Sequence, residues 1–123
     1  MSDPPAFSLS EALARVIGPN GLLHQRLKGY EAREGQVEMM RSVVQAIEDE
    51  QILLVEAPTG TGKSLAYLIP SLLSGRKTVV STATRTLQDQ LFHKELPFIR
   101  NELEIPFQAA LLKGRTNYLC LHL

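Results

Sequence analysis

Apolar residues recur at helical spacing in two stretches of the first half of the chain. In the first stretch, Ser8 and Glu11 have the spacing of a helix capping box, and Gly18-Pro19 ends the repeat of Leu9, Leu13, Val16 and Ile17. In the second, residues 36–49, one helical face is apolar and carries Val37, Met40, Val44 and Ile47. We expect a helix in each stretch, joined by a loop with some local helix.

The second half of the chain alternates short apolar runs with helical patterns. Residues 52–55 form an apolar run with β-branched ends before turn residues, which predicts a strand buried on both faces. Second and third strands are predicted at residues 78–82 and 108–112, with helices at residues 63–73 and 84–96. This alternation predicts an α/β fold with parallel strands and right-handed crossovers.

Two prolines interrupt the predicted helices. Pro70 is expected to remove the backbone bond to Ala66 and to kink or shorten its helix, and Pro97 is expected to end the helix that begins at Thr84.

Length and composition exclude several classes of protein. The 123 residues suit one modest domain, and thirteen basic residues balance thirteen acidic ones, so any contact with nucleic acid must be local. The longest apolar stretch, residues 65–73, is far shorter than the roughly 20 residues that cross a bilayer. The first residues lack a secretory signal, and a single cysteine forms no internal disulfide. A cytoplasmic location without a membrane partner is therefore expected.

A phosphate-binding loop (P-loop) is predicted between the first strand and the next helix. Its glycines permit close approach of backbone N–H groups to phosphate, its lysine reaches the β- and γ-phosphates, and its serine is a ligand for Mg²⁺. The loop consists of Ala57-Pro58-Thr59-Gly60-Thr61-Gly62-Lys63-Ser64. The alternative, a glycine turn before a helix, requires a chance match that we place at roughly one chain in a hundred. The strict motif has glycine at the position of Ala57.

Four segments together resemble the iron–sulfur helicases of superfamily 2, the group typified by DinG and XPD, and most closely the bacterial YoaA type. They are residues 30–36, the P-loop, residues 81–91 and residues 111–120. Alanine at the position of Ala57 is common in this group. The resemblance implies a partial RecA-like P-loop NTPase domain, three-layered with a mostly parallel sheet, truncated after about the third strand. Residues 1–29 would be an N-terminal helix and connecting loop, and residues 30–123 the start of motor domain 1, up to the iron–sulfur insertion.

The resemblance also implies roles for single residues. Gln36 would take the adenine edge with Arg33 nearby, because one amide can donate to N7 and accept from the exocyclic amine. The backbone of single-stranded DNA would contact Thr82, Thr84 and Gln90, and Cys120 would be the first of four thiolates of a 4Fe-4S cluster. Each residue also has a plainer interpretation: Gln36 starts a helix, Arg33 is a solvated charge, Thr84 caps a helix, and Cys120 is a small apolar residue or an idle thiol.

The intact parent is expected to be an ATP-dependent DNA helicase of DNA repair or replication, with ATP and Mg²⁺ as cofactors. The sequence contains no acidic box, no second motor domain and no further cysteines, so we expect negligible hydrolysis from these residues alone. Two alternatives stay open: a non-helicase P-loop protein such as a small kinase, and a regulatory module that binds a partner or single-stranded DNA without turnover.

Overall fold

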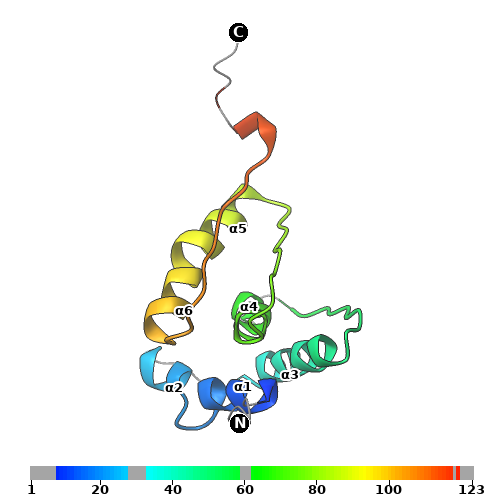
Figure 1. The fold of residues 1–123 in the computed structure, drawn as a ribbon, viewed down its shortest axis with the longest axis vertical. Helices are drawn as coiled ribbons and strands as arrows, with labels where there is room; N and C mark the ends of the chain where they lie inside the picture. Colours follow the sequence, from blue (N-terminus) through cyan, green and yellow to red (C-terminus); the bar gives the residue numbers. More distant parts are fainter. Residues whose placement is uncertain (1–7, 28–32, 59–61, 118, 120–123) are drawn as a thin grey trace, which may run out of the picture.

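The computed structural model describes residues 8–27, 33–58, 62–117 and 119, as helices joined by irregular segments (Figure 1). Three elements in the second half follow one another without a break and form one helical rod. The elements are α1 (Leu9–Ile17), α2 (Leu22–Arg26), α3 (Glu34–Glu48), α4 (Lys63–Leu73), the rod of α5 (Arg85–Gln90), the π-helix η1 (Leu91–Glu95) and α6 (Leu96–Glu102), and the 3₁₀ turn η2 (Arg115–Asn117).

The N-terminal helices form where the apolar spacing predicts them. The Ser8 hydroxyl accepts a hydrogen bond from the Glu11 backbone N–H at 3.1 Å, so the predicted cap of α1 is confirmed. At the other end of α1, the Gly18 N–H donates to the Ala14 carbonyl at 2.8 Å. The helix expected at residues 36–49 is confirmed as α3, and α2 provides the local helix in the loop between them.

The core lies where α1, α3 and α4 meet. Met40 of α3 and Ala66 and Ile69 of α4 have no exposed surface. Burial of a large apolar side chain stabilises the fold by about 1.5–3 kcal/mol, so this contact fixes the position of α4. Leu23 of α2 and Ile99 of α6 are equally buried and belong to the same apolar cluster. The core therefore holds the start of α4, which is the end of the P-loop, against α3.

The three predicted strands are not present in the described part of the chain. Residues 51–58, 77–82 and 104–114 are irregular, so the described residues form helices without a sheet, and the layered α/β architecture is not observed among them. Exposure alternates along the first run: Ile52 and Leu54 are 95% and 92% exposed, whereas Leu53 and Val55 are 39% and 44% exposed. One face is thus partly covered and the other is open. A buried strand needs neighbouring strands and a cover on both faces, which the described residues do not provide.

The helix that contains Pro70 spans the predicted residues 63–73, whereas Pro97 does not end its helix, contrary to the prediction. Pro70 is buried inside α4, which continues to Leu73. Pro97 lies in the first turn of α6, where a helix needs no backbone N–H. The turn before it is π-helical, and the Leu96 N–H bonds to the carbonyl of Leu91. A proline ring clashes with the carbonyl four residues earlier, and we attribute the continuation of the rod to this wider turn.

The π-helical turn holds a carboxyl group in an unfavourable environment. Glu95 Oε1 accepts a hydrogen bond from Gln90 Nε2 at 3.3 Å, whereas Oε2 is buried without a partner. Burial raises the pKa of Glu95 above its ordinary value of 4.5, and the hydrogen bond from Gln90 opposes this only in part. The folded state therefore binds the Glu95 proton more tightly than the unfolded chain does.

We expect Glu95→Gln to stabilise the fold at neutral pH. Above the raised pKa the folded state carries the full penalty of a half-buried carboxylate, and an amide removes about 0.5–1 kcal/mol of it after allowance for solvent screening. The penalty fades as the pH falls through the raised pKa and is absent below 4.5. Chemical denaturation at pH 7 and pH 4 measures this difference. The control is Glu38→Gln, because Glu38 is an exposed residue of α3. An equal gain in stability from both variants at pH 7 contradicts the expectation.

Candidate functional site

The two ends of the P-loop are defined in the structure. Ala57 and Pro58 form its beginning, and Gly62, Lys63 and Ser64 form its end at the start of α4. The predicted phosphate contacts at Thr59, Gly60 and Thr61 lie outside the described residues. The candidate site is therefore built from the ends of the loop and from α3, which packs beside it.

Gly62 has the backbone geometry for which a P-loop needs glycine. It is the N-cap residue of α4 and has left-handed backbone angles, φ 79° and ψ 42°. A Cβ atom at this position would lie 2.2 Å from Gln36 Nε2. The positive φ thus disfavours any side chain here, and a Cβ would also displace the Gln36 amide.

Lys63 joins the two described ends of the loop. Its Nζ donates a hydrogen bond to the Ala57 carbonyl oxygen at 2.8 Å, and the side chain is exposed. An ammonium group binds phosphate oxygens more strongly than a neutral carbonyl, because both partners are then charged. The chemistry of this ammonium group therefore fits a phosphate ligand.

Gln36 is buried against the loop, which the sequence did not indicate. Its side chain is 4% exposed, and its Nε2 donates to the Gly62 carbonyl oxygen at 3.1 Å. The same carbonyl accepts the Ala66 N–H at 3.2 Å, so Gln36 supports the first turn of α4. The plain interpretation of Gln36 as only a helix start is incomplete. A carboxamide has two N–H donors and an oxygen acceptor, so its chemistry fits the edge of a base.

The other residues predicted to contact ATP and Mg²⁺ are near Gln36 and Lys63 in the sequence but differ in their exposure to solvent. Arg33 is the N-cap residue of α3, three positions before Gln36, and it is exposed. Ser64 is half-buried in the first turn of α4. Hydroxyl oxygen is a hard donor of the kind that Mg²⁺ binds, so the chemistry of Ser64 fits this ion.

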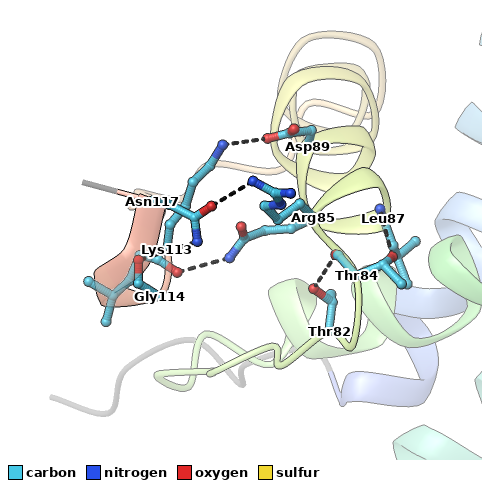
Figure 2. Close-up of polar contacts among 10 residues, drawn as sticks. Thr82, Thr84, Arg85, Leu87, Asp89, Lys113, Gly114 and Asn117 are labelled. Atoms are coloured by element: carbon cyan, nitrogen blue, oxygen red, sulfur yellow. Dashed lines mark hydrogen bonds and ion pairs between the residues drawn. The ribbon is translucent and has the colours of Figure 1, made fainter. Parts of the chain in front are cut away.

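The threonines predicted to hold DNA lie at the start of α5 (Figure 2). Thr82 Oγ1 donates to the Thr84 carbonyl at 3.0 Å, and Thr84 Oγ1 accepts from the Leu87 N–H at 3.2 Å. Thr84 is thus a helix cap, as its plainer interpretation predicts, although its hydroxyl proton can still be donated to a phosphate. Gln90 bonds to Glu95 further along the rod, about 9 Å from the helix start by helical rise. The structure does not bring it to the two threonines.

Sequence inspection missed the side chains that join α5 to the segment before Cys120. Arg85, Gln88 and Asp89 contact residues 112–117, which lie 24 to 32 positions later (Figure 2). Contacts at this separation leave no local periodicity, so no pattern in the chain indicates them.

The described residues do not provide a metal centre. Among them, no group of three or more histidine, cysteine, aspartate and glutamate side chains could hold a metal ion. Cys120 lies outside the described residues, and it is the single cysteine of the chain. An iron–sulfur cluster needs four ligands, so the residues present do not fit a complete cluster.

The amino-acid sequence can also be compared with those of known proteins. Residues 36–118 match the DEAD/DEAH box helicase family. The chain is 49% identical over 109 residues to the ATP-dependent DNA helicase YoaA of Haemophilus influenzae, covering 89% of this chain and 17% of that protein. It is 42% identical over 130 residues to the ATP-dependent helicase DinG of Mycobacterium tuberculosis H37Rv, covering 99% of this chain and 18% of that protein.

The chain therefore spans less than a fifth of the length of these curated relatives. No solved structure matches it. Over the ranges that the structure describes, no helix is both long and apolar enough to span a membrane.

Proposed function

Since this chain belongs to the DEAD/DEAH box helicase family, we propose that it binds ATP with Mg²⁺ and serves as the nucleotide-binding part of an ATP-dependent DNA helicase. The observation that carries the proposal is the fixing of both ends of the P-loop, by Lys63 on Ala57 and by Gln36 on Gly62. The family match favours this function over the small kinase, and a module without turnover differs only in lacking hydrolysis.

The proposed binding reaction is an exchange of partners at the loop. The backbone N–H groups of residues 59–62 would surround the phosphates, and Lys63 would leave the Ala57 carbonyl for the β- and γ-phosphate oxygens. Ser64 would contribute its hydroxyl to Mg²⁺. Gln36 and Arg33 would lie at the adenine, with Gln36 keeping its bond to Gly62, which supports this assignment because it brings the base reader to the loop.

We place the nucleic acid on the other side of α4, along the start of the rod. Thr82 and Thr84 would donate hydroxyl protons to the backbone of single-stranded DNA, a contact that is independent of base sequence. Gln90 would join them only if its side chain left Glu95. In a longer helicase, this part of the chain would contribute to DNA unwinding and to DNA repair. Cys120 would there be one of the four ligands of an iron–sulfur cluster, which nucleotide binding does not require.

The base selectivity of the site tests this function. Wild-type protein should bind Mg-ATP more tightly than Mg-GTP, and Gln36→Ala should reduce the preference by about tenfold, the value of one lost base contact. Titration calorimetry with both nucleotides measures the ratio. If Gln36 acts only through Gly62, the two affinities fall together and the ratio is unchanged. A wild-type chain that binds neither nucleotide contradicts the proposed function itself.

A further inference from the structure

The segment after α6 folds back and runs along the rod (Figure 1). The Ile105 N–H bonds to the Ile99 carbonyl at 3.4 Å, and the guanidinium carbon of Arg100 lies 4.5 Å from the centre of the Phe107 ring. Residues 112 and 113 contact Gln88 and Asp89 near the start of the rod, so the segment and the rod run antiparallel. Residues 112–117 thus arrive at α5, near Thr84 (Figure 2).

Three polar contacts attach residues 112–117 to one face of α5. Arg85, Gln88 and Asp89 have the spacing i, i+3 and i+4, which places their side chains together on a helix. The contacts are Arg85 Nη1 to Asn117 Oδ1 at 2.8 Å, Gln88 Nε2 to the Leu112 carbonyl at 2.9 Å, and Lys113 Nζ to Asp89 Oδ1 at 3.2 Å.

Polar groups and not apolar packing carry this attachment. Leu112, the large apolar residue at the start of the segment, is 83% exposed. Asn117 has a double role, because its N–H and its Nδ2 both donate to the Gly114 carbonyl, at 2.9 and 3.3 Å, while its Oδ1 accepts from Arg85. It therefore closes the η2 turn and connects this turn to the helix.

We propose that Arg85, Gln88, Asp89 and Asn117 form a clasp that positions residues 112–117 for binding the phosphate backbone of single-stranded DNA. The clasp holds Lys113 and Arg115 on the same end of the rod as the two threonines. A chain with no net charge needs such local concentration of cations to attract a polyanion. This inference rests on the proposed DNA binding, and the four residues act by positioning the cations.

Asp89 distinguishes positioning from simple attraction. Replacing its carboxylate with an amide makes the surface more positive, which by charge alone tightens DNA binding. The same change removes the ion pair between Asp89 and Lys113, and the loss of this anchor should weaken DNA binding if the clasp acts by positioning. The two accounts therefore predict opposite signs for Asp89→Asn. Asn117→Ala breaks the clasp without any change in charge.

The test is the binding of a fluorescent single-stranded oligonucleotide, measured by anisotropy over a range of salt concentrations. Asp89→Asn and Asn117→Ala should each weaken binding by about three- to tenfold. Each should also reduce the slope of log affinity against log salt by about 0.7 per lost phosphate contact. Glu104→Gln is the matched control, because it removes a carboxylate from another surface ion pair, 4.0 Å from Arg26. It should change neither quantity. An Asp89→Asn protein that binds as tightly as wild type, or more tightly, overturns the clasp.

Hydrogen exchange without DNA separates this inference from the proposed function. Residues 112–117 should exchange faster in Asn117→Ala and Asp89→Asn than in wild type and Glu104→Gln. Unchanged exchange together with normal DNA binding by wild type overturns the clasp and leaves the function intact. Faster exchange with no DNA binding by wild type overturns the DNA role for both the threonines and the clasp.

Discussion

Lys63→Ala should weaken the binding of Mg-ATP by about 100-fold. A charge-assisted hydrogen bond contributes about 1.5–3 kcal/mol, and the lysine would make such bonds to two phosphates while giving up only the Ala57 carbonyl. Each 1.4 kcal/mol is a factor of about ten in affinity, which gives the expected loss. Calorimetric titration of the two proteins with Mg-ATP measures it directly.

The matched control is Lys77→Ala, which removes an exposed lysine beyond the end of α4. Both variants should melt close to wild type, because neither residue belongs to the apolar core. Equal ATP affinity in wild type and Lys63→Ala would mean that the loop is a glycine turn before a helix, and the nucleotide function would fail with it.

Gly62→Ala should destabilise the fold by about 3 kcal/mol, whereas Gly75→Ala should cost about 1 kcal/mol. Both glycines have left-handed backbone angles, with φ of 79° and 70°. The difference is the space around them: a Cβ at position 62 meets Gln36 Nε2 at 2.2 Å, and a Cβ at position 75 meets no atom within 4 Å. Denaturant unfolding of the two variants isolates the close approach, since the backbone strain is common to both.

A second substitution identifies the source of the extra loss. In Gln36→Ala/Gly62→Ala the clashing amide is absent, so the double variant should be about 1–2 kcal/mol more stable than the sum of the single variants predicts. Additive losses would mean that the loop is displaced by backbone strain alone.

The sequence predicts the helices of this fold well because their signals are local. The Ser8 cap, the apolar face of residues 36–49 and the end of α4 depend on neighbours within four positions. The predicted strands are not confirmed, because the signals that form a strand are not local. The composition of Ile52 to Val55 favours a strand, but a strand also requires distant backbone partners, and along the described segments the alternate residues remain open to solvent.

The candidate site divides along the same line. The P-loop pattern predicts which residue types stand near phosphate, and the structure describes its two ends. The P-loop motif explains only in part why residue 62 is glycine. The structure adds that the Gln36 side chain occupies the space where a Cβ atom would lie. The pairing of Arg85 with Asn117, 32 positions apart, has no local pattern at all. Such contacts require three-dimensional coordinates.

The alternating exposure of residues 52–55 has a consequence for natural variation. Leu53 and Val55 are partly buried, whereas Ile52 and Leu54 are almost fully exposed to solvent. Selection for the stability of these helices should therefore act on the first pair and not on the second. A population under selection only for this helical arrangement would accept serine or lysine at positions 52 and 54. A lineage that keeps them apolar is under selection from something that covers that face, such as the further strands of a longer helicase. Variation at two residues thus reports which form of the protein evolution has preserved.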